Sequence, residues 1–230
     1  MFKWRSYLPL LLIIVIFLSL ADRQFGLTQT VPGIYWEMVC LAISVFGLGI
    51  RIYTVGHAPE GTSGRNTDDQ VASVLNSRGI YSIVRHPLYV GNYFMWLGVA
   101  LFPGIWWLAI MISLVFFIYY ERIMFAEEEF LRGKFGKTFE DWAVQTPAFI
   151  PDLRKWKKPE RGFLVKKVLR DEYSSMFAMV TSFLVVEVGQ HFIVSRTFHI
   201  DLPWLIILIA GFVLYIGLRT IKKTTHWLDI

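Results

Sequence analysis

The sequence predicts an all-α protein: a polytopic transmembrane helical bundle of about six spans, with a cytoplasmic amphipathic helix segment. Hydrophobic residues make up 55% of the 230 residues and aromatic residues 17%, and the mean hydropathy is +0.48. The apolar residues cluster in several runs that are long enough to cross the ~30 Å hydrocarbon core of a bilayer. Charged stretches separate these runs. Because backbone inside lipid must satisfy its own hydrogen bonds, the runs are expected to be helices.

Six apolar runs are candidate spans, at about residues 7–21, 34–55, 86–102, 104–120, 173–194 and 203–219. The first run is followed by Asp22 and Arg23 instead of a small-residue cleavage site, so we interpret it as a retained helix and not a signal peptide. The third and fourth runs meet at Pro103-Gly104, a pair of helix breakers that predicts a tight helical hairpin. The only cysteine, Cys40, lies inside a run and is expected to be a packing residue.

The distribution of basic residues predicts the orientation. With an even number of spans, all Lys and Arg residues except Arg23 and Arg196 fall on one side of the membrane. Basic loops stay in the cytoplasm, so both termini are expected there. We divide the chain into N-terminal transmembrane helices (1–63), a central core (64–151), a basic cytoplasmic linker (152–172) and C-terminal transmembrane helices (173–230). The basic residues have no nucleic-acid-binding module around them, so we expect no nucleic acid partner.

The polar residues that open the third run have the pattern of a binding site. Pro87 suits the first turn of a helix, where its missing N–H costs nothing. His86 is then a boundary residue, and the free N–H groups beyond it favour an anionic ligand group such as a carboxylate. Tyr89 lies one turn further on, and Gly91 permits a close approach to the backbone. The alternative is a capped transmembrane helix whose His and Tyr belong to an interfacial aromatic belt.

A second polar group follows the hairpin. On a helical wheel, Glu127 and Glu128 flank the apolar stripe of the segment 121–136, whereas Glu129 faces water. Carboxylates that border an apolar face require partners. A solvated charge run remains the alternative for this Glu triplet.

These residues together resemble the isoprenylcysteine carboxyl methyltransferase family and its bacterial relatives, which include phospholipid methyltransferases. The resemblance extends over about residues 64–151, and it rests on the run from Arg85 to Gly91, the hairpin, the Glu pair, Phe135-Gly136, and Pro147 with Ile150-Pro151. It implies a membrane-embedded methyltransferase that uses S-adenosylmethionine as its cofactor. The implied acceptor is a lipid or lipidated substrate from the bilayer: the carboxylate of a prenylated cysteine, a lipid phosphate or a head group.

The resemblance also implies roles for individual residues. Arg122 matches an arginine that orients the acceptor. The family usually has two tyrosines after Phe-Gly, and here Phe139 and Trp142 take their places. The positions that match cofactor contacts are Asn66, Leu75, Asn76, Tyr81, His86, Pro87, Leu88, Tyr89 and Glu127.

The spacing between Arg122 and Glu127 does not suit a regular helix. Five residues place the two side chains about 140° apart around the helix axis. If both serve one site, a single-turn π-bulge must absorb one residue, and we predict such an irregular turn within 122–127. The alternative is a regular helix in which Arg122 is held by Glu129 or by lipid phosphate, and in which Arg51 positions the acceptor instead.

Two other functions remain open. One is a membrane sterol-reductase-like enzyme that binds NADPH through a similar helix opening. The other is a non-enzymatic membrane subunit or transporter, for which Glu187 and His191, four residues apart in the fifth run, are candidates. A hydrogen bond between neighbouring helices is the simpler explanation of that pair. We expect no metal, and we expect a multi-pass protein of the bacterial inner membrane.

Overall fold

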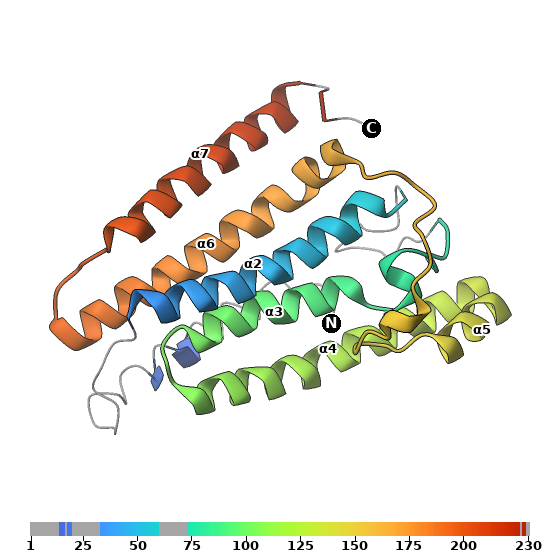
Figure 1. The fold of residues 1–230 in the computed structure, drawn as a ribbon, viewed down its shortest axis with the longest axis horizontal. Helices are drawn as coiled ribbons and strands as arrows, with labels where there is room; N and C mark the ends of the chain where they lie inside the picture. The colour runs from blue at the N-terminus through green and yellow to red at the C-terminus, as the bar shows by residue number, and fades with distance from the viewer. Residues whose placement is uncertain (1–13, 17, 20–32, 60–72, 226, 229–230) are drawn as a thin grey trace.

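The computed structural model describes residues 14–16, 18, 19, 33–59, 73–225, 227 and 228, and helices make up all of the named secondary structure in this part (Figure 1). The predicted all-α class is therefore confirmed. The elements are α2 (Ile34–His57), the 3-10 turn η2 (Ile80–Ser82), α3 (Pro87–Leu101), α4 (Trp106–Phe135), α5 (Lys137–Gln145), the 3-10 turn η3 (Leu153–Lys155), α6 (Val165–Ser195) and α7 (Leu202–Thr224).

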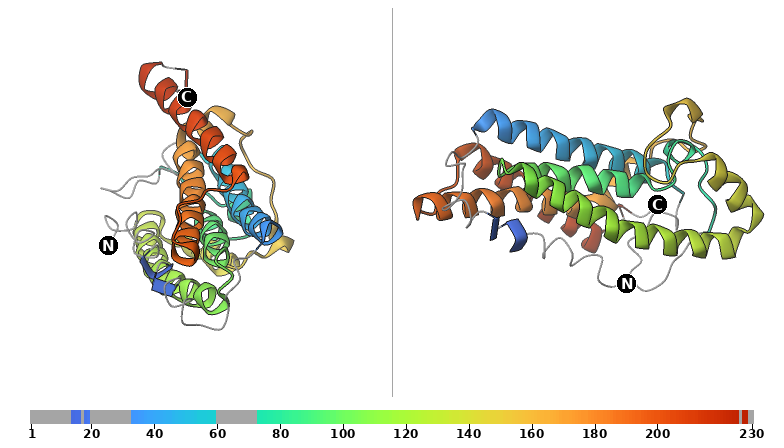
Figure 2. Two further views of the ribbon diagram at one scale, coloured as in Figure 1. Left: turned by 90° about the vertical axis from the view of Figure 1, so that its left-hand side faces the viewer. Right: turned by 90° about the horizontal axis from the view of Figure 1, so that it is seen from below.

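The long helices pack side by side in the order α7, α6, α2, α3, α4 (Figures 1 and 2). Aromatic side chains fill the core where α3, α6 and α7 meet, and Phe102 contacts both Phe183 and Trp204 edge to face at ring distances of 5.2 Å. Apolar residues on the outer face of α7, such as Ile206 and Phe212, are exposed. An exposed apolar helix face of this kind is typical of a lipid-facing surface.

Within the described part of the chain, four helices are long and apolar enough to cross a membrane: α2, α4, the 165–193 part of α6, and α7. The chain is thus a multi-pass membrane protein by the length and composition of its helices. α3 has only 15 residues, so its span is short. The predicted first span, 7–21, lies mostly outside the described residues. The total of six spans stays a prediction.

Helix α4 combines two predicted elements. It has 30 residues and is therefore about 45 Å long, well over the thickness of a hydrocarbon core. The predicted span 104–120 and the amphipathic segment 121–136 form this one helix, whose second half lies near α5 (Figure 1). The helix is regular α throughout 122–127, so the predicted π-bulge is wrong. α6 begins at Val165, so residues 165–172 of the predicted linker are helical as well.

Glycines let α2 and α3 approach closely. A Cβ built on Gly47 would lie 2.5 Å from the carbonyl oxygen of Gly91, and one on Gly98 would lie 2.2 Å from Oγ of Ser44. The backbone approach predicted at Gly91 is confirmed, and the neighbouring groups are the Gly47 carbonyl and the side chain of Arg51. This contact fixes the start of α3 against the end of α2.

Candidate active site at the start of helix α3

The loop before α3 is fixed by backbone hydrogen bonds to a distant segment. Arg85 donates its N–H to the carbonyl oxygen of Pro147 at 2.8 Å, and His86 donates to that of Ala148 at 3.2 Å. Asp152 donates to Ile83 at 2.9 Å in the same way. The motif around Pro147 therefore lies beside the Arg-His-Pro run and fixes its conformation. α3 begins at Pro87, as predicted, with His86 as its N-cap.

The Glu pair on α4 faces this loop, and each carboxylate has different partners. Glu127 Oε2 accepts a hydrogen bond from the Tyr89 hydroxyl at 2.9 Å and lies 3.6 Å from Nδ1 of His86. Glu128 is 2.9 Å from Nε2 of His86 through Oε1. Both oxygens of Glu128 accept from Arg85, Oε1 from Nε at 2.8 Å and Oε2 from Nη2 at 3.2 Å. The partners expected for two carboxylates beside an apolar face are therefore present.

His86 is buried between these two carboxylates and stacks on the ring of Tyr89, with 5.5 Å between ring centroids. Burial lowers the pKa of the imidazole, but the hydrogen bonds and negative charges of Glu127 and Glu128 outweigh it and hold the pKa above its ordinary value. The His86 side chain is only 4% exposed, whereas that of Glu127 is 38% exposed. Glu127 is therefore the member of this cluster that a ligand can reach.

Tyr81 joins the same cluster from η2. Its side chain is hydrogen-bonded to Asn76, and burial together with the negative charge of Glu127 raises the pKa of its hydroxyl. The indole of Trp142 on α5 donates to the Tyr81 carbonyl oxygen at 3.2 Å. The structure thus brings together five of the predicted cofactor residues, which we call the His86 cluster: Asn76, Tyr81, His86, Tyr89 and Glu127.

The other predicted cofactor residues are placed as follows. Leu75 is half-buried in the loop before η2, and Pro87 is buried in the first turn of α3. The backbone N–H of Leu88 has no hydrogen-bond partner among the described residues, which is the free donor expected at a helix N-terminus. Asn66 lies outside the described residues.

Arg122 does not face this cluster. Because α4 is regular, its side chain points about 140° away from Glu127, and it is exposed. Glu129 is paired with Arg132 and not with Arg122. The alternative stated for a regular helix therefore applies: Arg51, and not Arg122, is the candidate that positions the acceptor.

Arg51 lies in a second polar cluster between α2, α3 and α6. Its Nε and Nη2 donate to the two carboxylate oxygens of Glu172 at 2.9 and 2.7 Å, and its Nη1 donates to Asn92 Oδ1 at 2.5 Å. Asn92 in turn donates to the Tyr120 hydroxyl at 3.3 Å, and the Tyr120 ring lies 5.0 Å from that of Tyr89. A continuous chain of contacts therefore connects Arg51 with the residues around His86.

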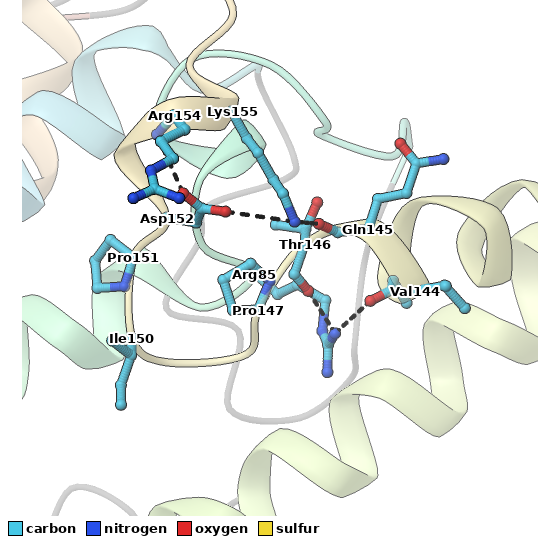
Figure 3. Close-up of a pocket in the computed structure, with 11 residues that line it drawn as sticks. Arg85, Val144, Gln145, Thr146, Pro147, Ile150, Pro151, Asp152, Arg154 and Lys155 are labelled. Atoms are coloured by element: carbon cyan, nitrogen blue, oxygen red, sulfur yellow. Dashed lines mark hydrogen bonds and ion pairs between the residues drawn. The ribbon is translucent and has the colours of Figure 1, made fainter.

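An open pocket of about 670 Å³ lies on the other side of Arg85, between the end of α5 and the 146–155 segment (Figure 3). Arg85 forms part of its lining and donates to the carbonyl oxygens of Ala143 and Thr146 at 2.7 and 2.6 Å. Arg154 and Lys155 line the same pocket. None of the predicted cofactor residues lines this pocket. Arg85 lines it and also binds Glu128, so Arg85 connects the pocket with the residues around His86.

Several residues of these clusters were not among the predicted site residues, and three of them hold the ion pairs: Arg85, Glu128 and Glu172. Arg85 stands next to His86 in the motif, and Glu128 borders the apolar stripe, so both carried a signal. Glu172 carried none, because nothing in the sequence connects it with Arg51, 121 residues earlier.

The sequence of this chain is similar to those of known proteins. Residues 38–138 match the family model described as phospholipid methyltransferase. This segment is similar to phospholipid methyltransferases and makes up less than half of the chain. This segment contains His86, Tyr89 and Glu127, and the resemblance predicted from the sequence is confirmed.

Three curated relatives match part of the chain. The protein-S-isoprenylcysteine O-methyltransferase of Schizosaccharomyces pombe is 36% identical over 90 residues, 39% of this chain and 36% of that protein. The nickel-cobalt-cadmium resistance protein NccN of Alcaligenes xylosoxydans xylosoxydans is 33% identical over 125 residues, 54% of this chain and 55% of the relative. The cobalt-zinc-cadmium resistance protein CzcN of Cupriavidus metallidurans is 30% identical over 146 residues, 63% of each protein.

The chain thus spans between about a third and two thirds of the relatives that it matches. No solved structure matches it at a significant level. The family match and the yeast relative support a membrane methyltransferase.

Proposed function

We propose that this protein transfers a methyl group from S-adenosylmethionine to a lipid-borne acceptor at the cytoplasmic face of a membrane. The observation that carries the proposal is the cluster of His86, Tyr89 and Glu127 at the start of α3, which lies inside the segment 38–138 that matches the family.

The residues at this site suit a ligand that has both an ammonium and a carboxylate group. The accessible carboxylate of Glu127, oriented by the Tyr89 hydroxyl, offers an acceptor for the ammonium group. The N–H of Leu88 at the helix N-terminus, which has no partner among the described residues, offers a donor for the carboxylate. When bound here, S-adenosylmethionine supplies an electrophilic methyl group. Tyr81 and Asn76 close the site from the side of η2.

Methyl transfer to an anionic acceptor requires few catalytic groups from the protein. An ionised carboxylate or phosphate is already a nucleophile, so no general base is required, and the residues have to position it and exclude water. A cation near the cluster would orient such an anion. Of the two arginines that the sequence offers for this role, Arg51 is connected to the cluster through Asn92 and Tyr120, whereas Arg122 points away.

The sidedness follows from charge. By their positions along the helices, the Lys and Arg residues of the described part, apart from Arg196, lie toward the end of the bundle that carries the His86 cluster, and such basic segments stay in the cytoplasm. This arrangement presents the site to the cytosol, where S-adenosylmethionine is made, while the acceptor enters from the bilayer. A bacterial inner membrane fits this orientation.

Calorimetric titration of the detergent-solubilised protein with S-adenosylmethionine tests the cofactor. Tyr89→Phe removes the hydroxyl that holds Glu127 and should weaken binding about tenfold, which is the value of one hydrogen bond to a charged group. Tyr93→Phe is the matched control one turn further along α3, because its hydroxyl contacts Ser113. Equal affinities in all three proteins, or saturable binding of NADPH instead, would contradict the proposal. Labelled cofactor with membrane lipid and protein fractions then identifies the acceptor.

A second candidate function is a part in resistance to divalent metal ions, because two of the relatives are named for such resistance. The test is growth of a deletion strain on cobalt or nickel salts, complemented with the wild-type chain or with Tyr89→Phe. Rescue by wild type alone would connect resistance with the methyltransferase site, and no rescue by either would exclude this candidate.

A further inference from the structure

A third cluster, separate from those of His86 and Arg51, consists of ionisable residues at the opposite end of the bundle, where α6 connects to α7 (Figure 2, right). Glu187 and His191 are four residues apart on α6 and therefore share one helix face. Asp201 caps α7. One donor atom from each of these three residues lies within 4.8 Å of the donor atoms of the other two.

Glu187 is the buried carboxylate of this cluster, and only one of its two oxygens has a partner among the described residues. Its side chain is fully buried, and Oε1 lies 3.1 Å from Nε2 of His191. The second oxygen, Oε2, is also buried and has no hydrogen-bond partner in the part of the chain that the structure describes. Buried carboxylate oxygens are nearly always hydrogen-bonded, paired or coordinated to a metal, because removing them from water is costly.

The charges around Glu187 make a bound cation favourable. Glu37 on α2 is also buried, and Glu37 and Asp201 both lie close enough to Glu187 to repel it electrostatically. The ion pairs of Glu187 and Asp201 among the described residues are with imidazoles, those of His191 and His199. Three carboxylates therefore lie near one another, and the ion-pair partners of Glu187 and Asp201 among the described residues are imidazoles that can themselves bind a metal.

We propose that Glu187, His191 and Asp201 bind a divalent transition-metal ion, with His199 holding Asp201 in place. An imidazole with two carboxylates suits zinc, cobalt or nickel, whereas calcium and magnesium prefer all-oxygen sites. Ligands about 2.1 Å from a tetrahedral ion lie about 3.4 Å from one another, close to the 3.1 Å between Glu187 and His191.

Asp201 completes this site from its exposed side. Its side chain is 41% exposed, so it can move the ångström or so that coordination requires, and it leaves an entry path for the ion. His199 Nε2 lies 3.0 Å from Asp201 Oδ1 and orients the carboxylate. Partners of this kind typically change metal affinity by about 10–100-fold. The proposal rests on these contacts alone and does not depend on methyl transfer.

The test is metal binding by the full-length, tag-free protein in detergent after treatment with a chelator. Titration with Co²⁺, followed by its visible ligand-field absorption, should show one saturable site per chain, which Zn²⁺ displaces. His191→Gln and Asp201→Asn should each weaken binding at least tenfold, and His199→Ala should weaken it about 10–100-fold. Asp171→Asn is the matched control, because Asp171 lies near the other end of α6 and pairs with Arg170.

Folding is checked by thermal unfolding in detergent, in which these variants should keep the cooperative transition of the wild type. Asp201→Asn carries the most weight, because its exposed position makes loss of folding a poor explanation for lost metal binding. No saturable Co²⁺ binding by the wild type would overturn the proposal. So would equal Co²⁺ affinity in the wild type, His191→Gln and Asp201→Asn, which would identify the cluster as ion pairs only.

Discussion

The two neighbouring carboxylates of α4 are predicted to have separable roles, and Glu→Gln substitutions distinguish them. Glu127 has a 38% exposed side chain that accepts a hydrogen bond from the Tyr89 hydroxyl, and its contact with Nδ1 of His86 is longer, at 3.6 Å. Its replacement should therefore change the free energy of unfolding by only about 1 kcal/mol. The loss of a charged partner for the ligand ammonium should cost about 1.5–3 kcal/mol of cofactor binding, or about 10–100-fold in Kd.

Glu128→Gln should have the opposite profile. The Glu128 side chain is 17% exposed and accepts from Arg85 twice and from His86 once. Breaking a largely buried ion pair typically costs 3–5 kcal/mol, and the remaining solvent access reduces this to about 3 kcal/mol here. For a chain of this size, that corresponds to a fall of about 10 °C in Tm.

Thermal unfolding in detergent and calorimetric titration with S-adenosylmethionine measure the two effects on the same samples. Glu129→Gln is the matched control, because Glu129 is exposed and pairs only with its helix neighbour Arg132. The reasoning fails if Glu127→Gln binds the cofactor as tightly as wild type, or if Glu128→Gln loses binding while its Tm is unchanged.

Three further outcomes are expected. Because the pKa of His86 is raised in the folded protein, its stabilising contribution is complete below its ordinary pKa and is lost as the pH rises through the raised value; Tm measured against pH should fall there, and His86→Gln should remove that fall. Gly98→Ala should destabilise the protein by at least 1–3 kcal/mol, because its Cβ would lie 2.2 Å from a neighbouring side chain, whereas Gly49→Ala meets nothing within 4 Å; equal Tm values would refute the close packing. Arg51→Lys should lower the methyl-transfer rate at saturating cofactor much more than Arg122→Ala does, and the reverse order would return the acceptor role to Arg122.

Patterns that depend on neighbouring residues predicted the local geometry around His86 well. Pro87 placed the start of α3 correctly, because the position of a proline in a helix is decided within one turn. The helical wheel placed Glu127 and Glu128 beside an apolar stripe, and both carboxylates meet partners from the α3 start. These interactions depend on local geometry, which a single sequence encodes directly.

Two predictions about the helices were wrong, for different reasons. The π-bulge within 122–127 was predicted only because Arg122 and Glu127 were assigned to the same site, and the backbone is regular there. Hydropathy also placed the start of α6 eight residues late, at 173, because Arg170, Asp171 and Glu172 interrupt the apolar run. Charges can lie inside a helix when tertiary partners neutralise them, and hydropathy has no information about such partners.

The pair between Arg51 and Glu172 connects α6 with the segment that matches the family, although the family match ends at residue 138. Arg51 lies inside the matched segment, and its side chain is only 12% exposed. Glu172, the residue that neutralises it, comes from α6 and lies outside that segment. An arginine this deeply buried would be strongly destabilising without its carboxylate. With Glu172 in place, the guanidinium also holds Asn92, which contacts Tyr120 beside Tyr89. α6 therefore contributes the charge that lets α2 and α3 carry a buried cation next to the proposed cofactor site.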